Sequence, residues 1–176
     1  MVKEVKLKNG QALLLRRVEE EDAEKIIKYL NIVGGESDNL LFGENEFNSS
    51  VEEEKLFISN FNKSNNLMII GLIDNNIVSI ANIVKSPRKR ISHNGEIAIS
   101  VKKEYWGIGI GYAVMNELIE FAKCNNIKNI SLGVKASNNK AINLYKKYGF
   151  KEIGCHKDFF NVNGKFDDEI LMDLYL

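Results

Sequence analysis

Apolar residues recur at helical spacing in four segments of the chain. In the first segment, the apolar residues would lie on one face of a helix: Ala23, Ile26, Ile27 and Leu30. Acidic residues precede them, where they stabilise the positive end of a helix dipole. In the second segment, Ser50 and Glu53 have the spacing of a capping box. We predict helices over residues 19–33, 50–63, the segment that follows Gly111, and residues 138–149, with Gly149 as the C′ residue.

Shorter apolar runs between these segments predict strands. The runs cover residues 12–18, 66–74, 76–86, 94–105 and 129–136, and two more lie within residues 150–176 on either side of the sequence VNGK. A turn around Asn75 and Asn76 and a second one at Pro87 predict hairpins. The order of strands and helices predicts a mixed α/β layer structure with the sheet covered by helices, and no linker divides it.

Composition narrows the function classes. The chain has 176 residues, of which 44% are hydrophobic and 27% are charged, and its formal net charge is zero. This balance gives no support for broad nucleic-acid or membrane-surface binding. No apolar run approaches the length of a membrane span, and the first residues are too polar for a secretory signal. Cys124 and Cys155 are far apart, which favours reduced thiols in the cytoplasm. His93 and His156 are the only histidines, so we expect no metal site.

The most informative local feature is the sequence WGIGIG, in which Gly107, Gly109 and Gly111 precede the third helix. The first N–H groups of a helix have no partner within it, and glycines open the backbone to a phosphate. A P-loop is excluded because Tyr112 and Ala113 stand where it needs lysine and Ser/Thr. A dinucleotide fingerprint is excluded because Tyr112 stands where it needs glycine. Two interpretations remain: a diphosphate cradle that uses neither lysine nor metal, and a tight turn with no ligand.

Two longer segments favour the cradle. YWGIGIGYAVMNELIEFA and ISLGVKASNNKAINLYKKYGFKEIG together resemble the Gcn5-related N-acetyltransferase (GNAT) superfamily, well over residues 94–176 and in element order before that. Trp106 replaces the polar first residue of the family motif. The resemblance implies one GNAT-like domain over residues 1–176, with a mixed, mostly antiparallel sheet of about seven strands and four flanking helices.

The resemblance also implies that the protein binds acetyl-CoA. The pantetheine arm would pair with the backbone at Ile99–Val101 and with Asn138, and the diphosphate would meet residues 108–113. The cofactor residues expected on this basis are Ile99, Ser100, Val101, Trp106, Gly107, Ile108, Gly109, Ile110, Gly111, Tyr112, Ala113, Asn138 and Tyr145.

Acetyl transfer to an amine needs a proton acceptor for the ammonium group and a proton donor for the departing thiolate. Tyr145 aligns with the family tyrosine beside the CoA sulfur, and a phenol of pKa about 10 stays protonated at neutral pH; packing is the alternative role. Glu96 lies where many relatives place a base, although a solvated or paired surface carboxylate fits equally. Other relatives carry a glutamate near position 133; this chain has Gly133 there and lacks that glutamate.

Further acids border the expected acceptor site, where they would attract a cationic amine, although ordinary surface charge is the preferred interpretation. They are Glu36, Asp38, Glu44, Glu46, Asp167, Asp168 and Glu169. The resemblance implies a cytoplasmic N-acetyltransferase that transfers acetyl directly to a primary amine of a small molecule or protein, as a monomer or homodimer. The alternative functions are a non-catalytic acyl-CoA sensor and an interaction module with an empty glycine turn.

Overall fold

Eight strands form one sheet in the computed structural model, which describes residues 2–176. The elements are β1 (Val2–Lys6), β2 (Ala12–Arg17), α1 (Ala23–Glu36), α2 (Val51–Lys63), β3 (Leu67–Ile73), β4 (Asn76–Lys85), β5 (Asn94–Val101), α3 (Ile110–Cys124), β6 (Asn129–Lys135), α4 (Asn139–Lys147), β7 (Lys151–Val162) and β8 (Lys165–Tyr175), with short 3₁₀ turns at Glu20–Asp22, Lys89–Ile91 and Lys103–Tyr105. This confirms the predicted mixed, mostly antiparallel sheet with four helices.

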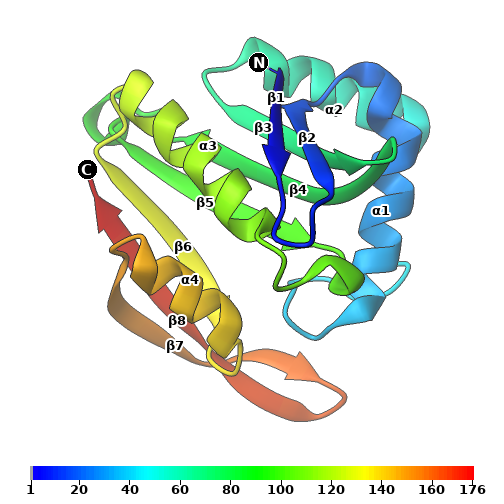
Figure 1. Ribbon diagram of the computed structural model, residues 1–176. Helices are drawn as coiled ribbons and strands as arrows, with labels where there is room; N and C mark the ends of the chain where they lie inside the picture. The colour runs from blue at the N-terminus through cyan, green and yellow to red at the C-terminus, as the bar shows by residue number, and fades with distance from the viewer. Residues whose placement is uncertain (1) are drawn as a thin grey trace.

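One pair of neighbouring strands near the centre of the sheet is parallel. The strand order is β1-β2-β3-β4-β5-β6-β8-β7, and every neighbouring pair is antiparallel except β5 and β6. These two strands are parallel and are connected through α3, as a crossover requires. They pair only where Asn94–Glu96 faces Asn129–Ser131 and then diverge (Figure 1). The inner edge of β5 from Ile97 onward therefore has no strand beside it.

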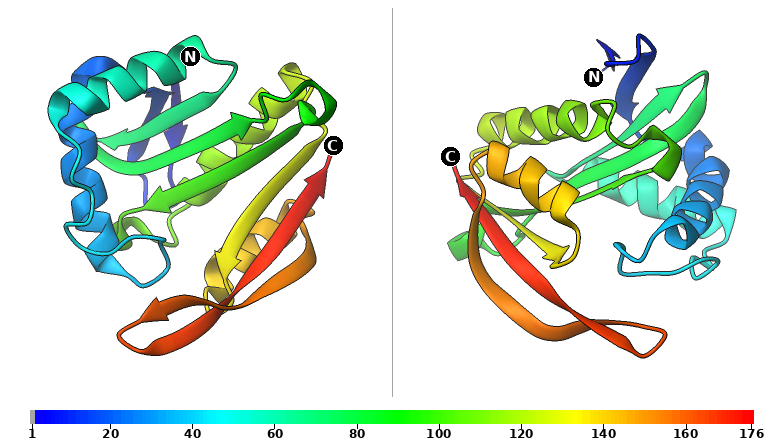
Figure 2. Two further views of the ribbon diagram at one scale, coloured as in Figure 1. Left: turned by 180° about the vertical axis from the view of Figure 1, so that it is seen from behind. Right: turned by 60° about the horizontal axis from the view of Figure 1, so that its bottom comes forward.

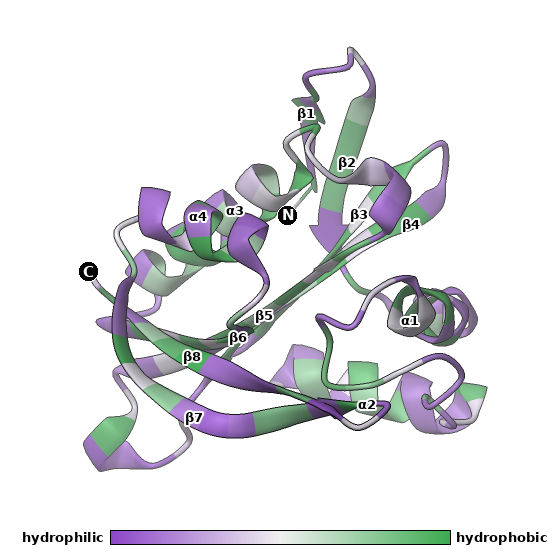
Figure 3. Cartoon of the chain, turned by 90° about the horizontal axis from the view of Figure 1, so that it is seen from below, coloured by the Kyte–Doolittle hydropathy of each residue, from purple (hydrophilic) through white to green (hydrophobic). Residues whose placement is uncertain are grey.

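The helices cover the two faces of the sheet in pairs (Figure 2). Helices α3 and α4 bury one apolar cluster against the sheet, with Met115 and Leu118 fully enclosed. Helices α1 and α2 bury a second cluster on the other face, around Ile26 and Ile58. Figure 3 shows long hydrophilic stretches along β7, which is exposed over most of its length. No helix within residues 2–176 is long and apolar enough to cross a membrane.

Local sequence signals fix several of these boundaries. Ser50 accepts a hydrogen bond from the N–H of Glu53, and the Glu53 side chain returns to the Ser50 N–H, which confirms the capping box. Gly149 has φ of 92° and ends α4 as predicted. The β3–β4 hairpin is confirmed, but its two central residues are Asp74 and Asn75, with φ of 48° and 61°. The turn thus lies one position earlier than predicted, and Asn76 begins β4, where the predicted strand begins.

Two elements differ from the prediction. Sequence periodicity does not predict strand β1, because its two valines, Val2 and Val5, are three residues apart and VKEVK lacks the alternation of a half-buried strand. Most of the strand lies exposed at the sheet edge. Helix α1 runs to Glu36 through Gly34 and Gly35, where a loop was expected. The following loop packs so closely on this turn that a Cβ on Gly34 would collide with the Gly43 carbonyl, so glycine is needed here for packing.

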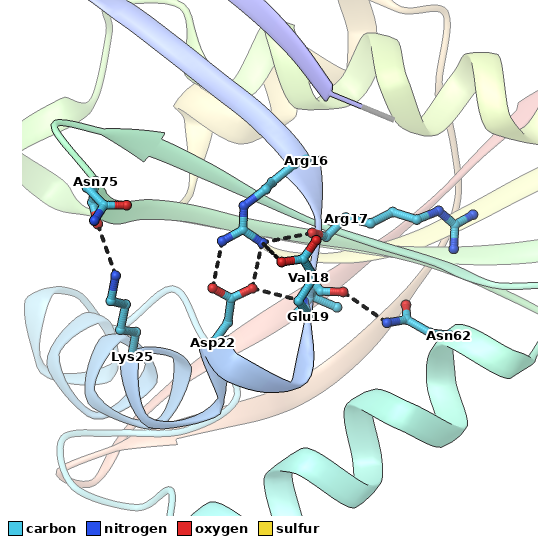
Figure 4. A network of polar contacts seen from close by, with 8 residues as sticks. All are labelled: Arg16, Arg17, Val18, Glu19, Asp22, Lys25, Asn62 and Asn75. Carbon is cyan, nitrogen blue, oxygen red and sulfur yellow. Dashed lines mark hydrogen bonds and ion pairs between the residues drawn. The ribbon is translucent and has the colours of Figure 1, made fainter.

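A buried ion pair attaches the start of α1 to β2 (Figure 4). The Arg16 guanidinium donates to both carboxylate oxygens of Asp22 at 2.6 and 2.7 Å, and the Glu19 N–H donates to the same carboxylate at 2.9 Å. Burial opposes ionisation of Asp22, but these hydrogen bonds outweigh it and hold the pKa of the carboxyl below its ordinary value.

Candidate active site

A cavity of about 650 Å³ opens where β5 and β6 diverge. Its wall is formed by β5, the glycine stretch, the start of α3, one side of α4 and the loop between α1 and α2. Eleven of the thirteen predicted cofactor residues line it: Ile99, Ser100, Val101, Trp106, Gly107, Gly109, Ile110, Gly111, Tyr112, Asn138 and Tyr145. The structure thus brings residues from three separate segments to one cavity.

The start of α3 presents unpaired N–H groups to this cavity. Gly109 is the N-cap residue and offers no side-chain acceptor. The first helical bond runs from the Ala113 N–H to the Gly109 carbonyl, so the N–H groups of Ile110, Gly111 and Tyr112 have no helical partner. Together with the helix dipole, they favour a negatively charged ligand at this position.

The three glycines serve different purposes. Gly107 and Gly109 have φ of 83° and 111°, in the left-handed region that side chains rarely adopt. A Cβ on Gly111 would instead lie 3.0 Å from Leu144 Cδ2, so this glycine allows α3 to approach α4. Ile108 does not line the cavity, because its side chain packs on the core and its carbonyl accepts from the Lys8 N–H. Ala113 is also buried away from the wall.

The indole of Trp106 attaches the glycine stretch to β5. Its Nε1 donates to the Val101 carbonyl at 2.7 Å, which closes the segment between β5 and α3. On the outer side, the Lys140 ammonium lies 5.5 Å from the indole ring centre, within reach of a cation–π contact. Trp106 therefore supplies structure where the family motif has a polar residue, and it uses one acceptor of the β5 edge.

Two polar residues at the cavity wall are held by neighbouring elements. Ser100 Oγ accepts a hydrogen bond from the buried hydroxyl of Tyr29 at 3.0 Å, which fixes β5 against α1. Asn138 caps α4, and its Oδ1 accepts from the Ala141 N–H at 3.2 Å. The side-chain NH₂ of Asn138 has no acceptor among residues 2–176, so it can donate to a ligand.

Tyr145 is the buried phenol of the cavity. It is 9% exposed, and its hydroxyl makes no hydrogen bond to any of residues 2–176. Burial raises the pKa of Tyr145 to about 12, so the phenol stays protonated at neutral pH. Tyr148 differs, because its hydroxyl lies within hydrogen-bond distance of the Tyr112 carbonyl and Asn116 Oδ1 on α3. Tyr105 and Tyr112 also line the cavity with hydroxyls that have no partner within residues 2–176, but of these three tyrosines only Tyr145 is buried.

Two carboxylates line the cavity, and the sequence predicts a catalytic role for only one of them, Glu96. Glu96 lines it from β5, where the residue is exposed and makes no hydrogen bond within residues 2–176. Glu169 lines it from β8 and is 9% exposed. Glu36, at the end of α1, and the acids of the α1–α2 loop do not line the cavity. Glu36 accepts from the Lys103 N–H, and the loop contributes Leu40 and Leu41 to the wall.

The chain matches the acetyltransferase (GNAT) family over residues 37–150. It is 34% identical over 107 residues to the L-amino acid N-acetyltransferase AaaT of Escherichia coli K12, a match over 59% of this chain and 65% of that protein. It is 32% identical over 76 residues to the ribosomal protein bS18 alanine N-acetyltransferase of the same organism, over 43% of this chain and 51% of that protein. The matched segments thus span less than two thirds of either relative.

Solved structures extend the similarity over most of the chain. A GNAT-family acetyltransferase from Streptococcus pneumoniae has a TM-score of 0.89 and 30% identity, covering 93% of this chain and 99% of that one. A phosphinothricin acetyltransferase from Sinorhizobium meliloti, solved in complex with acetyl-CoA, has a TM-score of 0.80 and 19% identity, covering 92% and 87%. The second likeness is one of fold alone.

Proposed function

The chain belongs to the GNAT acetyltransferase family, and from this premise we propose that it transfers the acetyl group of acetyl-CoA to a primary amine of a small molecule or a protein. Relatives of this chain are named as N-acetyltransferases of amino acids and of a ribosomal protein, and a neighbour of the same fold was solved with acetyl-CoA. The proposal depends on whether the cavity suits this donor and on whether its residues suit the transfer.

The cavity residues suit coenzyme A. When bound, acetyl-CoA supplies an activated acetyl group as a thioester, carried on a long polar arm that ends in a diphosphate. The free N–H groups of Ile110, Gly111 and Tyr112 would hold the diphosphate. The unpaired edge of β5 from Ile97 onward would accept the amide groups of the arm as a strand accepts a neighbour.

One observation carries the proposal: the unpaired edge of β5, the N–H groups at the start of α3 and Tyr145 all line a single cavity. A donor held at both places would bring its thioester beside the Tyr145 hydroxyl. Since this hydroxyl is protonated and has no partner within residues 2–176, it is free to donate its proton to the thiolate that leaves.

The compartment follows from the cysteines. Cys124 and Cys155 are both exposed and unpaired, which favours the reducing cytoplasm, where CoA thioesters and thiols persist together.

We assign the acceptor to the class of amines and to no single compound, because the loop of Leu40 and Leu41 that borders the cavity carries no charged side chain on its wall.

A turnover screen tests the proposal. Purified protein with acetyl-CoA and a panel of amino acids, polyamines, aminoglycosides and short peptides should release free CoA thiol with at least one amine, together with the acetylated product by mass spectrometry. In a thermal-shift assay, addition of CoA should raise the melting temperature, because a ligand that binds the folded protein stabilises it by mass action. A CoA-induced shift with no thiol release from any amine would favour the sensor, and no shift at all would contradict the proposed site.

A further inference from the structure

A buried carboxylate from the last strand stands at the acceptor side of the cavity. Glu169 on β8 pairs with Lys135 on β6 and with His156 on β7, and it is 9% exposed. Its side chain reaches along the sheet and lies over Gly133. A Cβ on Gly133 would collide with Glu169 Oε1 and lie 2.7 Å from Cδ. The carboxylate thus fills the space that any side chain at position 133 would occupy.

One oxygen of this carboxylate is held and the other is free. His156 Nδ1 lies 2.9 Å from Glu169 Oε2. An ionised carboxylate can only accept, so the imidazole donates its Nδ1 proton in this contact. Glu169 Oε1 accepts no hydrogen bond from any of residues 2–176. The carboxylate is therefore fixed in orientation while one oxygen stays available at the wall that also carries Tyr145.

Lys135 lies opposite Glu169 in the β6–β8 register, but it makes no ion pair with Glu169 within residues 2–176. The Lys135 ammonium lies 3.9 Å from Asp167 Oδ2 and over the ring of Phe160 at 5.8 Å. Asp167 also accepts from the Ser137 hydroxyl, so it has partners of its own. On β5, Glu96 pairs with Ser131, two residues before Gly133, and so lies on the same face of the sheet. A cationic amine that enters here meets two carboxylates, Glu96 and Glu169.

We propose that Glu169 is the group that takes the proton from the acceptor amine, and that His156 is a positioning residue that holds it. The inference rests on the proposed function. Glu169 is favoured over Glu96 because it is enclosed and held by a donor, whereas Glu96 is exposed and held by nothing within residues 2–176. A fixed base loses less freedom in the reacting complex than a mobile one.

The protons balance in this scheme. Glu169 Oε1 removes one proton from the ammonium group and releases it to water at the cavity mouth. The neutral nitrogen then bonds to the thioester carbonyl carbon, and the carbon–sulfur bond breaks as the sulfur takes the proton of Tyr145. The second proton of the nitrogen returns to the Tyr145 oxygen. The products are the amide, the free thiol and one proton in solution.

Glu169→Gln tests this assignment, since it keeps the shape and removes the base. We expect kcat/KM for the best amine of the panel to fall by about 100-fold or more, with an unchanged Kd for CoA by calorimetry. The remaining rate should rise about tenfold per pH unit toward the amine pKa, about 10.4 for a lysine-like amine, because only neutral amine then reacts. Glu120→Gln, an exposed carboxylate on α3, is the matched control and should behave as wild type.

The positioning role and the place of the carboxylate have their own tests. His156→Asn keeps an N–H donor and should retain most of the rate, whereas His156→Phe should lose about tenfold with an unchanged melting temperature. Moving the carboxylate by Gly133→Glu in an E169A background should recover rate over E169A alone. A Glu169→Gln rate within threefold of wild type, or a larger loss in Glu96→Gln, would overturn the assignment. A wild-type protein with no turnover would instead contradict the proposed function.

Discussion

Replacement of Tyr145 by phenylalanine separates catalysis from packing, because the structure predicts a large effect on rate and almost none on stability. The Tyr145 side chain is buried, and its hydroxyl faces the cavity with no hydrogen-bond partner within residues 2–176. Its removal breaks no hydrogen bond within the protein, so the free energy of unfolding should change by less than about 1 kcal/mol. Loss of a general acid should lower kcat by about 10²–10⁴, or roughly 3–5 kcal/mol of activation free energy.

The assay is thiol release under saturating acetyl-CoA, combined with urea unfolding and CoA calorimetry. Tyr148→Phe is the matched control, since its hydroxyl contacts Tyr112 and Asn116: it should lose about 1 kcal/mol of stability and keep its rate. With its pKa at about 12, Tyr145 should cause no loss of activity between pH 7 and 10. If Tyr145→Phe kept its kcat, or unfolded more easily by 2 kcal/mol or more, Tyr145 would be a packing residue.

Two further changes test other parts of the structure. Gly109→Val should raise the Kd for CoA at least tenfold by calorimetry, because valine strains the left-handed backbone of the cradle by about 1–3 kcal/mol; Gly164→Val, with φ of 80° at the β7–β8 turn, carries a similar strain and should leave the Kd unchanged. Asp22→Asn should lower the free energy of unfolding at pH 7 by about 3 kcal/mol, because it leaves Arg16 without its buried partner. Since folding lowers the Asp22 pKa, this stabilisation is fully present well above the ordinary value of 3.8 and is lost as the pH falls from there through the lower pKa of the folded state. A difference between variant and wild type that did not shrink as the pH fell below 3.8 would contradict the ion pair as its source.

Periodicity was enough to predict most of the fold, because most elements bury one apolar face. It failed at β1, whose residues bury almost nothing, and at the end of α1, where Gly34 reads as a helix stop. There the deciding contact comes from Gly43, nine residues later, and no local pattern contains it. Strand pairing at a sheet edge and close packing between segments both depend on tertiary contacts, which local periodicity does not contain.

The candidate site shows the same limit. The glycine stretch predicts a helix start with free N–H groups. It does not predict the packing of Gly111 on Leu144, because that contact depends on the position of α4. Glu169 could not be separated from Asp168 in the sequence DDE. Their roles diverge because successive residues of β8 face opposite sides of the sheet, and the β6–β8 register places Glu169 on the same face as Lys135 and Gly133. Asp168 pairs with Lys157 at the surface, while Glu169 turns inward.

The central claim is that backbone N–H groups at the start of α3 hold the diphosphate of the donor and place its thioester at Tyr145. A crystal structure of the protein with CoA tests it most directly. We predict diphosphate oxygens within hydrogen-bond distance of the N–H groups of Ile110, Gly111 and Tyr112, with the arm along β5 and the sulfur beside the Tyr145 hydroxyl. Coenzyme bound elsewhere on the molecule, with these N–H groups facing only water, would contradict it.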